Sequence, residues 1–222
     1  MNTTTQQIAC IFDLDGVLVD TAVYHYKAWK QLANSMGFDF THVQNEQLKG
    51  VSRMRSLDMI LEWGGIHKSD AEREELASLK NSWYVAMISN MTTDEVLPGS
   101  AELLQQLKEK GVKIALGSAS KNSGLILERT GLTHFFDAIV DGNAVTASKP
   151  NPEVFVKAAE LLETSAADCV VFEDAIAGVE AALAAGMGVV GVGEAEQLKG
   201  AHIVVKDLSA ITVAEIGALK NK

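Results

Sequence analysis

From residue 98 onward, short apolar runs of the chain alternate with amphipathic helical patterns that end at glycine. The first helical pattern covers 100–110, ends at Gly111 and leads into the apolar run 112–117. Three more repeats predict helices over 121–130, 152–162 and 175–185 and strands over 138–140, 169–172 and 189–192. With the apolar run 8–11, this alternation predicts an α/β fold, in which a Rossmann-like parallel sheet of about five strands carries helices on both faces.

Residues 21–92 follow a different pattern, with helical spacing and no convincing strand. Ser69 and Glu72 match a capping box at the start of one of these helices. Apolar residues share helical faces in three groups: Tyr24, Ala28 and Leu32; Trp29, Ala33 and Met36; and Leu76, Leu79, Trp83 and Met87. We expect these stripes to form the core of a small helical bundle rather than to bind a cofactor.

The chain is therefore predicted to consist of an α/β catalytic core, residues 1–20 and 93–222, and an inserted helical cap domain, residues 21–92. The cap leaves the core just after the first strand and its loop, and it rejoins the core near Pro98 and Gly99. A lobe tethered at this point can close over the ends of the strands and exclude water from a site there.

Asp13 and Asp15 come directly after the first predicted strand and are followed by Gly16. Ligands of open α/β sheets bind outside the carboxyl ends of the strands, so both carboxylates should be exposed together there. Two adjacent carboxylates favour a bound cation, with one of them as nucleophile and the other as acid/base. A calcium loop is the poorer reading, because Val17 to Val19 lack its ligands. An Asp-rich turn without a catalytic role is the other alternative.

Polar residues also follow three other predicted strands or loops: Ser118, Lys149 and the pair Glu173-Asp174. A serine hydroxyl and a lysine suit the oxygens of a phosphate, and a second acidic pair would complete an oxygen cage for Mg²⁺. Each residue alone also fits a helix cap, a solvated lysine or an acidic N-terminus of a helix. Their occurrence in this order at successive strand ends favours one shared site.

The composition limits the partners of the chain. Its formal net charge is −10, from 29 acidic and 19 basic residues, which opposes binding to nucleic acid or to an anionic membrane surface. No apolar segment approaches the roughly 20 residues of a transmembrane helix, and the polar N-terminus does not resemble a signal peptide. We therefore expect a cytoplasmic protein. The sequence leaves the oligomeric state open, and a monomer is our working expectation. Cys10 and Cys169 lie in predicted strands and are expected to be buried, reduced thiols.

Asp13-x-Asp15, Ser118, Lys149 and Glu173-Asp174 match the four motifs of the haloacid dehalogenase superfamily of phosphotransferases, and the resemblance covers nearly the whole chain. The chain is similar to the hexose-phosphate mutases of that superfamily in further strings: 13–21, His25, Trp29, 45–53, Lys80-Asn81 and 118–122. One departure is Gly117, where alanine would be more usual. It puts little in doubt beyond the stiffness of the loop.

The resemblance implies the haloacid dehalogenase fold and assigns roles at the strand ends. Asp13 would become an aspartyl phosphate, and Asp15 would deliver and retrieve the proton of the sugar hydroxyl. Mg²⁺ would be held by Asp13, the carbonyl oxygen of Asp15 and Asp174, with Glu173 in or near that shell. The phosphoryl group in transfer would be held by Ser118 and Lys149.

The resemblance also implies a second phosphate site and a sugar site. The second phosphate would be bound by Arg53, Ser120, Lys121 and Asn122. Gly50, Val51, His25 and Lys80 would contact the sugar or couple cap closure to Asp15, and Trp29, Ser52 and Ala119 are expected at the substrate as well. Arg53 and Lys121 as plain surface charges are the alternative.

The activity implied is an isomerase that interconverts β-glucose 1-phosphate and glucose 6-phosphate, with β-glucose 1,6-bisphosphate as intermediate and activator. Small hexose phosphates would be its partners. A Mg²⁺-dependent sugar-phosphate phosphatase of the same fold is the main alternative. A non-catalytic sugar-phosphate sensor is the third alternative. It is opposed by the intact Asp13, Asp15, Lys149 and Asp174, since a binding protein needs no nucleophile.

Overall fold

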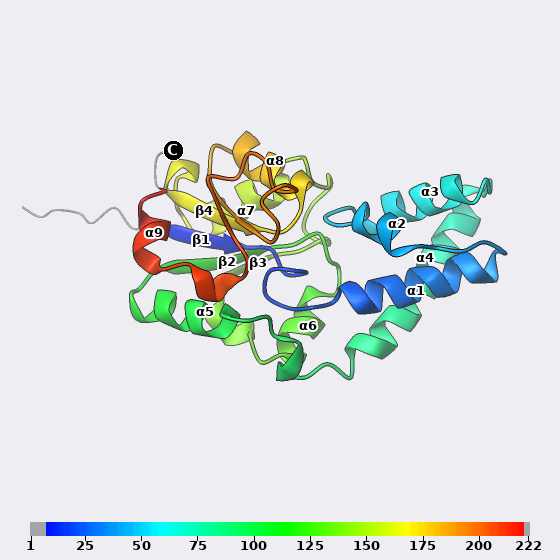
Figure 1. The fold of residues 1–222 in the computed structure, drawn as a ribbon, viewed down its shortest axis with the longest axis horizontal. Coiled ribbons are helices and arrows are strands. Elements are labelled where there is room, and N and C mark those ends of the chain that lie inside the picture. Colours follow the sequence, from blue (N-terminus) through cyan, green and yellow to red (C-terminus); the bar gives the residue numbers. More distant parts are fainter. Residues whose placement is uncertain (1–7, 220–222) are drawn as a thin grey trace, which may run out of the picture.

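A six-stranded parallel sheet forms the centre of the larger of two lobes in the computed structural model, which describes residues 8–219 (Figure 1). The strands are β1 (Ala9–Phe12), β2 (Lys113–Gly117), β3 (Ala138–Val140), β4 (Cys169–Glu173), β5 (Gly188–Val192) and β6 (Ile203–Val205). They lie in the order β3-β2-β1-β4-β5-β6, and every neighbouring pair is parallel. The predicted α/β fold is confirmed. The order puts β1 between β2 and β4, so the loops that follow these strands meet.

Helices cover both faces of the sheet. Those of this lobe are α5 (Ser100–Glu109), α6 (Ser123–Arg129), α7 (Glu153–Leu161), α8 (Ile176–Ala184) and α9 (Val213–Gly217). Side chains alternate between the faces along β1: Cys10 and Phe12 join the apolar cluster that contains α5, α6 and α9, whereas Ala9 and Ile11 join the cluster that contains α7 and α8. Because both faces are buried, the strand is apolar along its whole length, as the sequence indicates.

The smaller lobe is helical and is built from residues that the sequence assigns to the insertion (Figure 1). Its helices are α1 (Ala22–Ser35), α2 (His42–Glu46), α3 (Arg53–Trp63) and α4 (Asp70–Ile88). Trp29, Leu32, Phe40 and Ile60 belong to an apolar core of its own. The capping box of Ser69 at the start of α4 is confirmed.

The predicted apolar stripe on α4 is wrong in part. Leu76 and Trp83 pack against the core of the helical lobe, but Leu79 is 43% exposed. The buried face of α4 instead carries Ala77, Lys80, Tyr84 and Ile88. Lys80 and Tyr84 line a cavity between the lobes although each is almost fully buried, and a pattern of apolar residues cannot reveal such a face.

Two chain segments connect the lobes and lie side by side. The amide of Asp20 donates to the carbonyl oxygen of Glu95 at 2.9 Å, and the amide of Leu97 donates to that of Leu18 at 2.9 Å. Tyr24 of α1 donates its hydroxyl to Glu95 Oε1 at 2.9 Å. The junction is thus a short hydrogen-bonded hinge next to the end of β1.

The remaining regular structure is short. It comprises the 3₁₀ helices η1 (Thr93–Glu95), η2 (Thr133–Phe135), η3 (Ala166–Asp168) and η4 (Leu208–Ala210). Strand β6 was not predicted, because its three residues are only half buried and give a weak pattern. Cys10 and Cys169 are both buried and free, which confirms the expectation for them. Within residues 8–219, every helix is too short or too polar to cross a bilayer.

Candidate active site

Asp13 lies at the carboxyl end of β1 and is held by the neighbouring loops. Its amide continues the pairing with β4 by donating to the carbonyl oxygen of Phe172 at 3.0 Å. Lys149 donates from Nζ to Asp13 Oδ1 at 2.5 Å and to Glu173 Oε1 at 3.3 Å. Burial by itself would lower the pKa of Lys149, but the carboxylates of Asp13 and Glu173 outweigh burial and raise this pKa. Lys149 is therefore a permanent cation beside the predicted nucleophile.

Three carboxylates at this point form a group that could hold a metal ion. One oxygen from each of Asp13, Glu173 and Asp174 lies within 4.8 Å of the others. Burial and the charge of Asp13 raise the pKa of Asp174 to about 6, and burial raises the pKa of Glu173 well above its usual value. Glu173 Oε2 is buried without a hydrogen-bond partner among the described residues. Crowded carboxylates of this kind fit Mg²⁺, which prefers oxygen ligands and would relieve their repulsion.

Asp15 has surroundings suited to proton transfer. Its Oδ1 accepts a hydrogen bond from Thr21 Oγ1 at the start of α1. Burial and the nearby charge of Asp13 raise the pKa of Asp15 to about 7, although the bond from Thr21 opposes the shift. A carboxyl group with a pKa close to neutral pH can both give and take a proton, as a general acid and base must.

A cavity of about 600 Å³ lies between the two lobes above these carboxylates. Most of the predicted site residues line it: Asp13, Asp15, His25, Trp29, Gly50, Val51, Ser52, Arg53, Lys80, Ala119, Ser120, Lys121, Asn122 and Asp174. Ser118, Lys149 and Glu173 are buried and are not among its lining residues. The structure thus brings the predicted residues of both lobes to one place.

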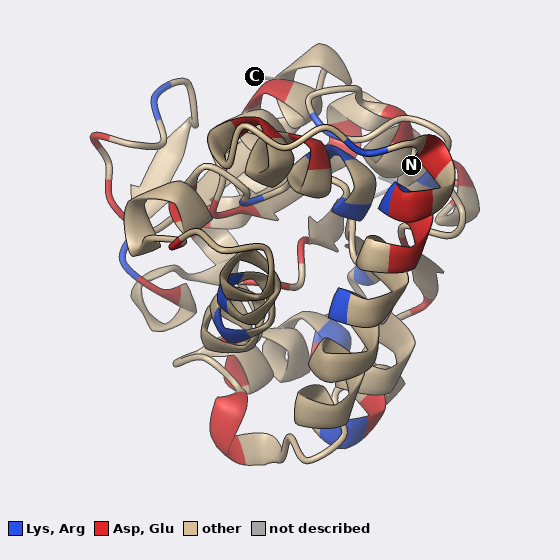
Figure 2. Cartoon of the chain, turned by 90° about the vertical axis from the view of Figure 1, so that its right-hand side faces the viewer, with Lys and Arg blue, Asp and Glu red and all other residues tan. Residues whose placement is uncertain are grey.

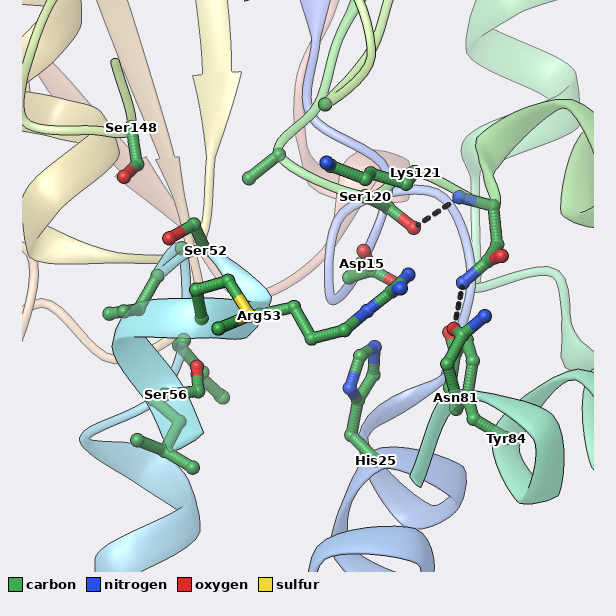
Figure 3. Close-up of a pocket in the computed structure, with 18 of the residues that line it drawn as sticks. Asp15, His25, Ser52, Arg53, Ser56, Asn81, Tyr84, Ser120, Lys121 and Ser148 are labelled. Carbon is green, nitrogen blue, oxygen red and sulfur yellow. Dashed lines mark hydrogen bonds between the residues drawn. The ribbon is translucent and has the colours of Figure 1, made fainter. Parts of the chain in front are cut away.

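Cations without carboxylate partners gather at this cavity. Among the described residues, no ion pair involves Arg53, Lys80 or Lys121. The side chain of Arg53 extends from α3 into the cavity, as does that of Lys121 from the loop after β2 (Figure 3). Elsewhere, acidic residues are scattered over the molecule with Lys and Arg interspersed, and no continuous basic stripe is visible in Figure 2. Unpaired cations in an acidic chain indicate a site for an anion.

Lys80 is the most buried of these cations, with 2% of its surface exposed. Its Nζ lies 3.2 Å from His25 Nδ1 and sits over the rings of Trp29 and Tyr84, 4.4 and 4.6 Å from their centroids. Burial and the charge of Arg53 lower the pKa of Lys80 to about 7. Burial and the charges of Lys80 and Arg53 also lower the pKa of His25 well below its usual value, so His25 is neutral.

The loop after β2 is shaped by its own hydrogen bonds and touches the helical lobe. Ser118 Oγ accepts from the amide of Ser120 at 3.1 Å, and Ser120 Oγ accepts from the amide of Asn122 at 3.2 Å. Asn122 Nδ2 donates to Asn81 Oδ1 of α4 at 3.0 Å, a contact between the lobes that Figure 3 displays. The loop therefore presents its side chains to the cavity in a defined arrangement.

Several residues at the site received no role from the sequence. Thr21 holds Asp15, Asn81 joins the lobes, and Tyr84 lines the cavity. Lys49 Nζ lies 3.4 Å from Asp174 Oδ2 and 2.9 Å from Glu46 Oε2. A position at the start of α1 is a signal for Thr21, but Asp174 and Asn122, which bond to Lys49 and Asn81 at the site, come from distant parts of the chain.

Gly117, the departure from the usual alanine, has a packing reason. A Cβ atom there would lie 2.9 Å from Phe155 Cδ1 and 3.0 Å from Ile11 Cγ2. The ring of Phe155 also lies beneath Lys149, whose Nζ is 4.7 Å from the ring centroid. Glycine at the end of β2 thus leaves room for the ring on which Lys149 rests.

The fold and the sequence match the haloacid dehalogenase class of α/β proteins. The model of the haloacid dehalogenase-like hydrolase family matches residues 10–192, and the chain belongs to this family. It is 45% identical over 207 residues to a β-phosphoglucomutase from Bacillus subtilis, with 92% of each chain covered. The crystal structure of a β-phosphoglucomutase from Clostridium difficile matches with a TM-score of 0.93 and 42% identity, over 97% of both chains.

A phosphatase is among the more distant relatives. The chain is 32% identical over 181 residues to a phosphorylated carbohydrates phosphatase from Thermotoga maritima, which covers 81% of this chain and 82% of that protein. The relatives described here therefore include both mutases and a phosphatase. Of these, the Bacillus and Clostridium mutases are more similar to this chain than the Thermotoga phosphatase.

Proposed function

We propose that the chain interconverts β-glucose 1-phosphate and glucose 6-phosphate through β-glucose 1,6-bisphosphate. The observation that carries this proposal is that cations without an ion-pair partner among the described residues line the same cavity as Asp13 and Asp15, where they would form a second anion site. Arg53 supplies it from one lobe and Lys121 from the other, together with Ser120 and Asn122. The similarity to the Bacillus and Clostridium mutases supports the choice of sugar.

The reaction runs through a phosphorylated Asp13. A carboxylate oxygen of Asp13 attacks one phosphorus atom of the bisphosphate, the bond from that phosphorus to the sugar oxygen breaks, and Asp15 gives its proton to the leaving oxygen. The reverse step delivers the phosphoryl group to the other hydroxyl of a sugar monophosphate, from which Asp15 takes the proton. One turnover therefore converts one monophosphate into the other and restores the starting enzyme.

Asp13, the carbonyl oxygen of Asp15 and Asp174 would hold Mg²⁺, with Glu173 in or near that shell. When bound, the ion neutralises charge on the phosphoryl group. Lys149, which is bonded to Asp13, and Ser118 would contact the same group. Positioning and charge neutralisation then provide most of the rate, as is general for phosphoryl transfer.

The second anion site favours a mutase over a phosphatase. A phosphatase needs to bind a single phosphate and then admits water to its phosphorylated carboxylate. A mutase must bind a bisphosphate in either orientation and keep water away. The guanidinium group of Arg53 can bind two oxygens of the phosphate that is not reacting. The binding energy of this phosphate can hold the cap closed before chemistry begins. The phosphatase remains the second candidate because the Thermotoga relative has that activity.

One assay separates the candidates. Protein is given β-glucose 1-phosphate, Mg²⁺ and a trace of the bisphosphate, and glucose 6-phosphate and free phosphate are followed in parallel. We expect glucose 6-phosphate to accumulate with little free phosphate. Release of one phosphate per sugar consumed would refute the mutase, and binding without turnover would indicate a sensor.

The finer features of the proposal follow from charge and architecture. Residues 21–92 act as a cap over the core of 1–20 and 93–222. Hexose phosphates, rather than nucleic acid or membranes, are the partners of this acidic chain, which works as a monomer in the cytoplasm. Light scattering coupled to gel filtration tests the monomer, for which the expected mass is that of one chain, 23.8 kDa.

A further inference from the structure

Gly178 lies in the first turn of α8, a helix that is otherwise rich in alanine. Glycine destabilises a helix interior relative to alanine, so its presence there needs a compensating reason. The backbone conformation does not provide this reason, because φ of Gly178 is not positive and other residues could adopt it. The reason must therefore lie in what a side chain would meet.

A side chain at 178 would collide with Glu173. A Cβ atom built there would lie 1.7 Å from Glu173 Oε1, 2.1 Å from Cδ and 2.2 Å from Cγ. Glu173 is fully buried, and the same Oε1 accepts the hydrogen bond from Lys149. The carboxylate thus fills the space that a methyl group on the helix would need.

We propose that Gly178 is a positioning residue for the acidic group that binds the metal. Without a side chain at this position, the Glu173 carboxylate can lie beneath the first turn of α8, within reach of Lys149 and of Asp13. An alanine would push the carboxylate out of this place. The inference rests on the proposed metal site and holds for a mutase and a phosphatase alike.

Gly16 leaves room for Asp174, the other member of the acidic pair, in the same way as Gly178 leaves room for Glu173. A Cβ atom at Gly16 would lie 2.2 Å from Asp174 Oδ2. Gly16 also has a φ of +81°, so its substitution would strain the backbone as well. Gly178 is therefore the position at which the steric effect can be tested alone.

The test measures Mg²⁺ binding by isothermal titration calorimetry for the parent protein and for Gly178→Ala. The matched control is Gly124→Ala, which lies in the first turn of α6, where a Cβ atom would meet nothing within 4 Å. We expect Gly178→Ala to weaken Mg²⁺ binding at least tenfold and Gly124→Ala to leave it unchanged. Equal affinities of Gly178→Ala and the parent would overturn the inference.

A rescue distinguishes positioning from general damage to the helix. Glu173→Ala removes Cγ, Cδ and the carboxylate, which are the atoms that a Cβ at position 178 would strike. We expect Gly178→Ala to weaken Mg²⁺ binding much less in the Glu173→Ala background than in the parent. The same loss in both backgrounds would mean that the methyl group acts on the helix and not on Glu173, which would contradict the proposal.

The same set of proteins provides controls for loss of folding and for the presence of the metal site. If Gly178→Ala does not fold, the double variant with Glu173→Ala should still fold and bind Mg²⁺ as Glu173→Ala does. A double variant that fails to fold where Glu173→Ala folds would refute the inference. A parent protein that binds no Mg²⁺ would overturn the metal site, and this inference with it. That result is distinct from equal binding by the parent and Gly178→Ala.

Discussion

Lys80 and Arg53 lie in the cavity between the lobes without a carboxylate to pair with among the described residues, in a chain with a net charge of −10. Burial of an unpaired cation costs stability. The rings of Trp29 and Tyr84 offset part of the cost for Lys80, because they attract its charge. In the proposed function, an anionic ligand would compensate the rest when it binds. The cations at this site would then serve binding at the expense of stability.

The pKa of Lys80 makes a prediction for the pH dependence of stability. Burial and Arg53 lower this pKa to about 7, from 10.5 in the unfolded chain. Between these values the unfolded chain binds more protons than the folded protein, so this residue makes stability rise with pH. We expect Lys80→Met to be more stable than the parent at pH 7, and its advantage to shrink by on the order of 2 kcal/mol between pH 7 and pH 9.

Urea unfolding of both proteins at several pH values measures this difference. Taking the difference removes groups that titrate equally in both proteins, such as the exposed carboxylates. An advantage of Lys80→Met that stays constant from pH 7 to pH 9 would contradict the assigned surroundings of Lys80.

Arg53 makes a second prediction at this scale. Arg53→Ala should lower isomerisation by roughly 10- to 100-fold, because it removes a charged hydrogen bond to the phosphate that is not reacting. Hydrolysis of a simple aryl phosphate, which has no second phosphate, should stay nearly unchanged. Arg55→Ala is the control, since Arg55 is an exposed residue of the same helix. Equal losses in both reactions would exclude the second anion site.

At the scale of elements, the loops after β1, β2 and β4 meet because these strands are neighbours in the sheet. The packing beneath the loops is tight where α7 crosses the end of β2. Phe155 of α7 is fully buried there, and Lys149 lies over its ring. The position of the helix and that of Lys149, the predicted catalytic lysine, are thus linked through one aromatic ring.

Gly117→Ala tests this packing. The added methyl group would approach Phe155 and Ile11 closer than ordinary contact, so we expect a loss of about 1–3 kcal/mol in the free energy of unfolding. In a Phe155→Leu background the loss should be smaller, because the ring that it strikes is gone. Urea unfolding of the four proteins measures both values. A Gly117→Ala protein as stable as the parent would mean that the ring can move aside.

At the scale of the whole molecule, the proposed second anion site is divided between the lobes. Arg53 belongs to α3, whereas Ser120 and Lys121 belong to the loop after β2. A phosphate that binds all three must hold the lobes together across the hinge at Asp20 and Glu95. Binding and closure are therefore one event in this arrangement.

Small-angle X-ray scattering tests closure. The Asp13→Asn protein cannot accept the phosphoryl group, so it should bind β-glucose 1,6-bisphosphate and Mg²⁺ without turnover. We expect its radius of gyration to fall on addition of both ligands, and not to fall when Arg53→Ala is added. A fall of equal size in both proteins would show that Arg53 is not needed for closure.

The sequence alone determined the α/β fold, the helical nature of the insertion and the acidic and basic residues at the strand ends. Burial along one helix or strand leaves a periodic pattern of apolar residues in the sequence. A polar residue directly after a buried strand is also visible in the sequence, because it interrupts an apolar run. For this reason Asp13, Lys149 and Asp174 could be assigned to one site before any contact was known.

Only the tertiary structure decided which side chains of distant elements meet. The amphipathic face of α4, the contact of Lys49 with Asp174 and the need for glycine at 117 and 178 all depend on neighbours that the local sequence does not encode. Each arises where segments that are far apart in the chain come into steric contact or bring charged groups close together. The periodicity of the sequence indicates whether a residue is buried. Only the packing in three dimensions shows which residues it is buried against.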